Sequence, residues 1–124
     1  MANLAADYVA VMVPAEHFAV SKAFYAALGW KITDLGPQLA RMELAGSRLL
    51  LQDFYVEQHA GNFVIQVRVE DANAWHAHIC AVLESGDFGK ARAIAPRQEP
   101  WGPLTTYAID PSGVLIHFAQ WPKT

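Results

Sequence analysis

The chain has little of what several classes of protein require. Cys80 is the only cysteine in 124 residues, so no disulfide can form within the chain, as is typical of a reducing compartment. Its apolar runs are too short to span a bilayer, and the first residues lack the basic and apolar segments of a secretory signal. We therefore expect a cytoplasmic protein in which Cys80 is a buried, inert thiol.

Clusters of basic residues are also missing. The chain has 9 Lys and Arg against 12 Asp and Glu, giving a formal net charge of −3, and the basic residues are scattered. This distribution argues against nucleic acids and anionic membranes as partners. Hydrophobic residues make up 53% of the chain, which excludes disorder and is enough for one packed domain over residues 1–124.

The pattern of apolar residues predicts two similar halves, about 7–54 and 62–120, each with a strand, a helix and three further strands. The first half is expected to contain strands at 8–13, 30–35, 39–44 and 48–54 and a helix at 16–28. The second half is expected to contain strands at 62–69, 91–95, 104–109 and 114–120 and a helix at 71–84. Asp71 is a suitable N-cap for the second helix, and Gly29 ends the first.

A tight turn is predicted in the last hairpin of each half. Ala45-Gly46-Ser47 forms the first turn, and Asp110-Pro111-Ser112-Gly113 forms the second. The strand after the second turn carries His117 in an otherwise apolar run. His117 is therefore either a site residue or a core histidine held by a backbone carbonyl, and the strand alone leaves both open.

Two segments carry a resemblance to a known superfamily. A helix end of vicinal oxygen chelate proteins resembles residues 21–30, Ser-Lys-Ala-Phe-Tyr-Ala-Ala-Leu-Gly-Trp. The closing hairpin of these proteins resembles Pro100-Trp101-Gly102 followed by residues 107–113. This superfamily includes glyoxalase I, bleomycin-resistance proteins, fosfomycin-resistance transferases and extradiol dioxygenases. The resemblance covers about residues 7–120 and implies an α+β fold, in which tandem βαβββ modules form a cupped mixed sheet with helices outside.

The resemblance also implies where relatives would hold a metal ion, on the first and last strands of each half. The matching positions in this chain hold Tyr8, Val64, Leu50-Leu51-Gln52 and His117. Because a single imidazole cannot hold a catalytic divalent ion, we expect no metal and no cofactor. An atypical site built from Asp53, His59 and His117 stays open as an alternative.

Alternation along the strands predicts which side chains face the cup. Thr105 and Tyr107 face inward by resemblance to fosfomycin-resistance proteins. The predicted ligand-binding residues are Tyr8, Met12, Gln52, Tyr55, Val64, Gln66, Arg68, Trp101, Thr105, Tyr107, Leu115 and His117. This mixture of apolar walls and a few hydrogen-bonding groups is typical of small-molecule pockets.

Several of these residues have a purely structural alternative. Arg68 could extend to the sheet edge or pair with Glu70 or Asp71, and Gln66 could lie at a subunit contact. Tyr8 and Tyr107 could be wall residues with hydroxyls in water, and Trp101 could be a packing plug instead of a lid. Phe54 is expected in the core, and Trp30, Trp75 and Trp121 in packing or a subunit interface.

Two functions follow from the resemblance. The first is a metal-free binding protein similar to the bleomycin-resistance group, a homodimer that holds an apolar or aromatic small molecule. The second is a small-molecule enzyme, with His117 as general acid or base and Tyr107 or Arg68 stabilising negative charge. The histidine favours an enzyme, whereas the lack of a second inward-facing carboxylate favours binding.

Overall fold

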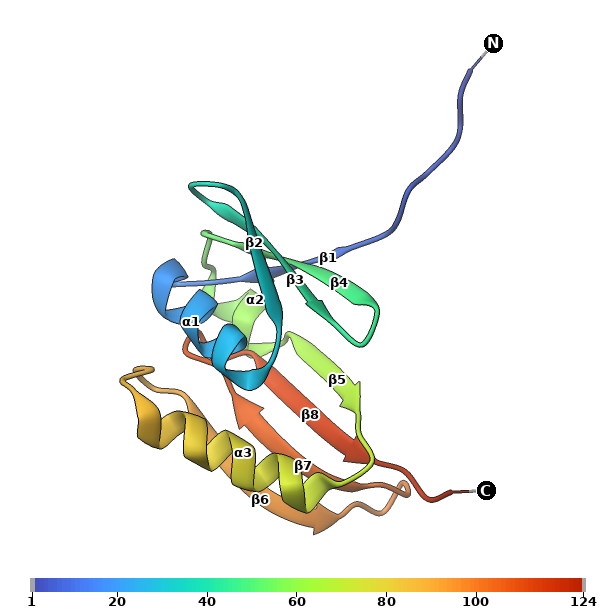
Figure 1. Ribbon diagram of the computed structural model, residues 1–124, viewed down its shortest axis with the longest axis vertical. Helices are drawn as coiled ribbons and strands as arrows, with labels where there is room; N and C mark the ends of the chain where they lie inside the picture. The colour runs from blue at the N-terminus through green and yellow to red at the C-terminus, as the bar shows by residue number, and fades with distance from the viewer. Residues whose placement is uncertain (1, 124) are drawn as a thin grey trace.

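The computed structural model describes residues 2–123, and the predicted order of elements is present in both halves (Figure 1). The first half contains β1 Val11–Pro14, α1 Phe18–Leu28, β2 Lys31–Gly36, β3 Leu39–Leu44 and β4 Ser47–Gln52. The second half contains β5 Val64–Arg68, α3 Ala72–Ser85, β6 Arg92–Gln98, β7 Leu104–Ile109 and β8 Leu115–Gln120. An unpredicted short helix, α2 Glu57–Gly61, joins the halves and contains His59. None of the helices in residues 2–123 has the length and hydropathy to cross a membrane.

Each half forms its own mixed, four-stranded sheet. The order of strands is β1-β4-β3-β2 in the first sheet and β5-β8-β7-β6 in the second. In each sheet the first strand lies parallel to the last, and the other neighbours are antiparallel. The protein therefore has the predicted α+β fold of two βαβββ modules. Its strands, over the described residues, form two sheets with no pairing between them.

The helix ends follow the sequence signals. Gly29 ends α1 with φ of 122°, a backbone conformation that residues with a Cβ rarely adopt. Asp71 precedes α3, and its carboxylate accepts a hydrogen bond of 3.0 Å from the backbone N–H of Ala74. This bond satisfies one of the free N–H groups in the first turn of the helix.

The first strand is shorter than predicted. Pairing with β4 begins at Val11, which lies opposite Leu49, and extending this register back would place Tyr8 opposite Gly46, in the turn before β4. Residues 2–10 form no regular element and extend away from the body of the molecule (Figure 1). The expectation of a strand beginning at Tyr8 is therefore wrong for residues 8–10.

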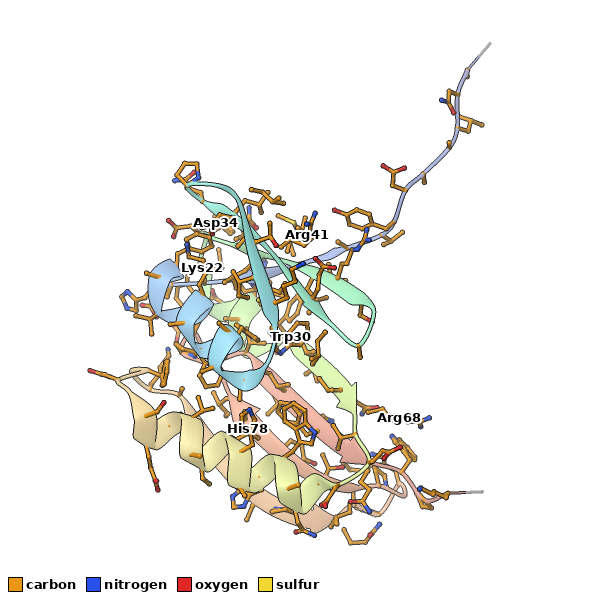
Figure 2. The ribbon with its side chains drawn as sticks, in the orientation of Figure 1. Lys22, Trp30, Asp34, Arg41, Arg68 and His78 are labelled. Atoms are coloured by element: carbon orange, nitrogen blue, oxygen red, sulfur yellow. The ribbon has the colours of Figure 1, made fainter. Side chains whose placement is uncertain are left out.

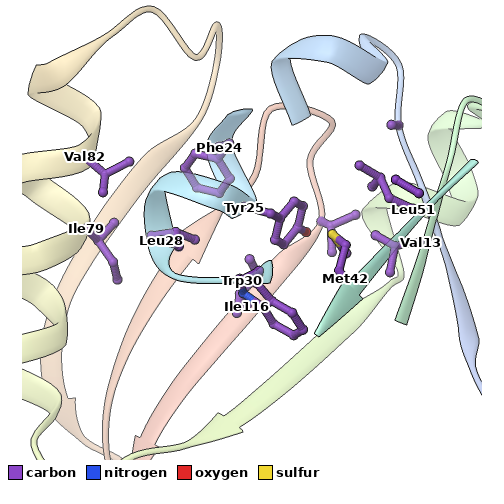
Figure 3. Packing of buried hydrophobic residues seen from close by; sticks show 14 of the residues in the cluster. Val13, Phe24, Tyr25, Leu28, Trp30, Met42, Leu51, Ile79, Val82 and Ile116 are labelled. Carbon is purple, nitrogen blue, oxygen red and sulfur yellow. The ribbon is translucent and has the colours of Figure 1, made fainter. Parts of the chain in front are cut away.

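One face of each sheet is covered by helices, and we call the other its open face. Val13, Leu51 and Met42 of the first sheet and Ile116 and Phe118 of the second are fully buried, and all belong to one core. Helices α1 and α3 contribute further residues to this core (Figure 3), in which the Phe24 and Tyr25 rings meet edge to face with centroids 5.7 Å apart. The residues that alternate with the core residues lie on the open faces, as the period of two requires.

The turn of the second hairpin connects the two halves. The buried Asp110 carboxylate accepts hydrogen bonds from the Tyr25 hydroxyl on α1 (2.7 Å) and from the backbone N–H groups of Ser112 (2.7 Å) and Val114 (2.9 Å). The Ser112 hydroxyl in turn accepts from the backbone N–H of Glu16 at 2.8 Å. Burial raises the pKa of Asp110, and the Tyr25 hydroxyl and the backbone N–H groups oppose that rise.

Two expectations about single residues are wrong. Phe54 was expected in the core but is 51% exposed, because it follows the last paired residue of β4 and is not held by the sheet. Cys80 was expected to be buried but is half-buried, with its sulfur 3.5 Å from the imidazole of His76 one turn earlier on α3. Trp30 and Trp75 do pack: Trp30 is 5% exposed, and Trp75 stacks on Phe118 with ring centroids 4.8 Å apart.

Candidate functional site

The open face of the second sheet carries a row of polar and aromatic side chains. Pairing across the sheet places Gln66 of β5 opposite His117 of β8, His117 opposite Tyr107 of β7, and Tyr107 opposite Ile94 of β6. The His117 and Tyr107 rings meet edge to face, with centroids 4.9 Å apart. Because paired residues in neighbouring strands point to the same side, this row forms one continuous surface.

A hollow of about 310 Å³ lies over this row. Its lining consists of Ile94, Arg97, Trp101, Tyr107, Leu115 and His117, all from the second half of the chain. Trp101 comes from the loop between β6 and β7 and is 53% exposed. The hollow therefore combines apolar and aromatic walls with a guanidinium and an imidazole, a composition suited to a small organic molecule.

Glu99 is a buried residue that contacts two lining residues of the hollow, Arg97 and Tyr107. Its carboxylate is 4% exposed and accepts hydrogen bonds from the Tyr107 hydroxyl and the Arg97 Nε, both 2.5 Å long. These two donors lower the pKa of Glu99, while burial and the nearby carboxylate raise the pKa of Tyr107. Glu99 is therefore an anion at neutral pH, and Tyr107 keeps its proton.

His117 lies on the wall of the hollow and is not a core histidine. It is only part-buried, and its Nδ1 lies 3.5 Å from the Gln66 amide nitrogen. Because an amide nitrogen only donates, Nδ1 acts as the acceptor in this arrangement and the ring proton is assigned to Nε2. Burial lowers the pKa of His117, and the negative charge of Glu99 partly opposes this shift. The neutral ring is therefore favoured at neutral pH.

The structure brings most of the residues predicted in the second half onto one face. Trp101, Tyr107, Leu115 and His117 line the hollow, and Gln66 borders it through His117. Val64 lies opposite Leu115 and is 54% exposed. Whether these residues contact a ligand stays a prediction, but their grouping is a property of the fold.

Thr105 and Arg68 lie farther along the same face. Thr105 is fully buried, and its hydroxyl has no hydrogen-bond partner among the described residues. Arg68 points away from the body at the edge of β5 (Figure 2), with its guanidinium 5.2 Å from the centroid of the Trp121 ring. The pairing of Arg68 with Glu70 or Asp71, considered from the sequence, does not form among the ion pairs of residues 2–123.

The residues predicted in the first half lie elsewhere. Tyr8 stands before β1, 44% exposed, with the Arg48 guanidinium 4.7 Å from its ring centroid. Met12 and Gln52 lie on the open face of the first sheet, since they alternate with the buried Val13 and Leu51. Tyr55 packs against the core beside Lys90 and not at the mouth of the hollow. None of these four lines the hollow beside His117.

The alternative metal site does not form. Asp53, His59 and His117 are not gathered, and the described part of the chain contains no group of three or more His, Cys, Asp or Glu positioned to hold a metal ion. Two of the positions at which the resemblance places metal ligands hold Val64 and Tyr8. Val64 is apolar, and Tyr8 lies before the start of β1.

Arg97 and Glu99 were not predicted from the sequence, and a β-bulge explains why. Ile94 pairs with Tyr107 and Arg97 with Thr105, so the two residues between them on β6 match a single residue on β7. Simple alternation would place Ile94 and Arg97 on opposite faces, whereas the bulge brings both to the hollow. The available signal was Pro96 next to Arg97, because a proline inside a strand often marks a bulge.

Comparison with known proteins identifies the fold. No protein-family profile and no curated protein sequence matches the chain. Solved structures do match. A bleomycin resistance determinant encoded on the transposon Tn5 has a TM-score of 0.76 and 22% identity, over 95% of this chain and 100% of that one. A bleomycin-binding protein complexed with bleomycin has a TM-score of 0.75 and 22% identity, over 94% of this chain and 100% of the other.

An enzyme shares the same fold. Lactoylglutathione lyase from Agrobacterium tumefaciens matches with a TM-score of 0.67 and 16% identity, covering 93% of each chain. The chain therefore has the glyoxalase/bleomycin-resistance fold, as the resemblance of its motifs predicted. Because binding proteins and an enzyme share this fold, the function has to be argued from the residues of the site.

Proposed function

We propose that this protein binds a small apolar or aromatic compound, without a metal ion, in the hollow between Trp101 and the Tyr107–His117 row. The observation that carries the proposal is the lining of this hollow of about 310 Å³: three aromatic or heteroaromatic rings and two aliphatic side chains, with one guanidinium at the rim. Flat rings gain both apolar burial and edge-to-face contacts in such a site. The bleomycin-binding protein of the same fold supports a binding role.

We further propose that the binding form is a homodimer. The hollow is lined by the second half alone, and its neighbours Val64 and Trp101 are 54% and 53% exposed. The segment before β1 exposes Leu4 and Val9 at 90% and 91%, which is unusual for side chains that stay in water. A second copy covering these residues would enclose the ligand. Light scattering at micromolar concentration should give twice the mass of 13.6 kDa, and a monomer would contradict this proposal.

The binding test uses benzofuran, a flat apolar probe without a hydrogen-bond donor. Binding is followed by NMR chemical-shift titration in the wild type, Trp101→Ala and Phe54→Ala. The two replaced rings are matched in exposure, 53% and 51%, but only Trp101 lines the hollow. We expect Trp101→Ala to weaken binding by about tenfold through lost stacking area, and Phe54→Ala to leave it unchanged. Equal effects of the two variants, or no saturable binding, would contradict the proposal.

An enzymatic function is a second candidate, because a neutral imidazole and a phenol backed by a carboxylate stand side by side in the hollow. In that case His117 acts as general base, and the exposed Arg97 guanidinium stabilises the developing negative charge, because the Tyr107 hydroxyl proton is donated to Glu99. His117→Ala would then abolish turnover of a substrate while its affinity stays nearly intact. Parallel loss of affinity and turnover would assign His117 to binding. Elemental analysis tests the metal-bound version, which requires one divalent ion per chain.

A further inference from the structure

The arginines on the open face of the second sheet differ in whether a carboxylate pairs with them. Arg68, Arg92 and Arg97 belong to the strand positions of this face, and no carboxylate occupies any of those positions. Among ion pairs of residues 2–123, only Arg97 has a partner on this face, the buried Glu99. The face around the hollow is therefore positively charged, although the whole chain has a formal net charge of −3.

Arg97 is held in one orientation by its contacts. Its Nε donates to Glu99 over 2.5 Å, and its guanidinium carbon lies 5.7 Å from the centroid of the Tyr107 ring. The side chain is nevertheless 69% exposed and lines the hollow. A guanidinium fixed through Nε keeps its two terminal NH₂ groups for other acceptors, and these form a fork that matches the two oxygens of a carboxylate.

The remaining lining restricts where a negative group could sit. Leu115 and Ile94 offer no hydrogen bond, and Glu99 repels anions from behind Tyr107. The Trp101 indole and the neutral His117 ring each offer a single uncharged N–H, which cannot match both oxygens of a carboxylate. The exposed guanidinium at the rim is thus the position where a ligand can place a charge without losing all of its hydration. An apolar ring would lie against Trp101 and the Tyr107–His117 row.

From this arrangement we propose that the ligand is an aromatic carboxylate, whose ring fills the hollow and whose carboxylate is held in two-point contact by Arg97. This inference rests on the proposed binding function and names the ligand class for the same site. A neutral aromatic compound would leave the fork of Arg97 in water and gain only from apolar contacts. The carboxylate adds a charge-assisted pair that is partly shielded from water by the walls.

The test compares three probes with the same ring system: benzofuran, benzofuran-2-carboxamide and benzofuran-2-carboxylate. Dissociation constants are measured by NMR titration at pH 7.5 and low salt. We expect the carboxylate to bind about tenfold more tightly than the carboxamide, and added salt to reduce this preference, because the rim is solvent-exposed. Equal affinity of carboxylate and carboxamide would overturn the inference.

Arg92 provides a matched control for Arg97. Both are exposed arginines on β6 and on the same face, but Arg92 does not line the hollow. Arg97→Lys keeps the charge and removes the fork, so the preference for the carboxylate should fall to about threefold, and Arg97→Gln should abolish it. Arg92→Gln should leave the preference unchanged. Equal losses in Arg92→Gln and Arg97→Gln would indicate a diffuse charge effect and overturn the two-point contact.

The two proposals fail in different ways. If benzofuran binds through Trp101 but the carboxylate has no advantage, the binding function stands and the ligand class is wrong. If none of the three probes binds in a Trp101-dependent way, the binding function itself is wrong. Benzofuran should bind Arg97→Gln as tightly as it binds the wild type, which also shows that the variant is folded.

Discussion

The open faces of the two sheets share a strand order but differ in how their charges are arranged. On the first sheet, Arg41 and Arg48 lie 3.0 and 3.8 Å from the half-buried Glu43 on the same face. On the second sheet, Arg97 alone has a carboxylate partner, and that partner is buried beneath the surface. On the first face a single carboxylate at the surface is shared by two guanidinium groups, whereas Glu99 contacts Arg97 from beneath and leaves its guanidinium exposed and oriented. The second face is therefore the better candidate for a binding surface.

The closing hairpins of the two halves differ as well. The first turn, Ala45-Gly46, is exposed, and both residues have positive φ, 52° and 79°, as tight two-residue hairpins require. The second turn, at 110–113, is buried except for Gly113 and is bonded to α1 through Tyr25. A duplicated module thus kept one turn as a simple connection and used the other to join the halves.

The largest effect that would test this difference is expected at Asp110. Asp110→Ala leaves the Tyr25 hydroxyl and two backbone N–H groups without partners in the core, which should lower the free energy of unfolding by about 3 kcal/mol. Tyr25→Phe removes only one of these bonds and should cost about 1 kcal/mol. Urea unfolding measures both. If Asp110→Ala lowered the free energy of unfolding by less than Tyr25→Phe does, the turn would not be what joins the halves.

A smaller effect is expected from the ionisation of Glu99. Because its pKa is lowered in the folded protein, the ionised carboxylate stabilises the fold above the ordinary Glu pKa, and this contribution disappears as the pH falls through the lowered value. The melting temperature of the wild type should therefore fall more steeply between about pH 5 and pH 3 than that of Glu99→Gln. Parallel curves would mean that Glu99 has no special environment, and the contrast between the open faces would weaken.

The smallest effect is expected at the first turn. Ala45 has a Cβ in the left-handed region, so Ala45→Gly relieves strain while making the unfolded chain more flexible. The balance should raise the free energy of unfolding by about 0.5 kcal/mol. Gly46→Ala adds a Cβ at φ of 79° and should lower it by about 1 kcal/mol. A loss of several kcal/mol in Ala45→Gly would mean that this turn, like the second, has a structural role.

Much of the architecture was predictable from the sequence because it follows from local rules. Alternation placed Gln66 and His117 on the open face and Val67 and Phe118 toward the core, and the structure agrees. The N-cap at Asp71 and the end of α1 at Gly29 followed from backbone chemistry. The start of β1 was misplaced because alternation does not reveal how far the chain pairs with β4, and that is a tertiary fact.

The sequence by itself determined the duplicated order of elements and, outside β6, the face on which the paired strand residues lie, because turn chemistry and a period of two act between neighbours in the chain. Only the tertiary structure decided that Arg97 lines the hollow with Glu99 behind it, because a bulge in β6 changes the alternation there. It also decided that Asp110 meets Tyr25, since that bond joins residues 85 positions apart. Contacts of this kind depend on packing across the whole core, which no local pattern encodes.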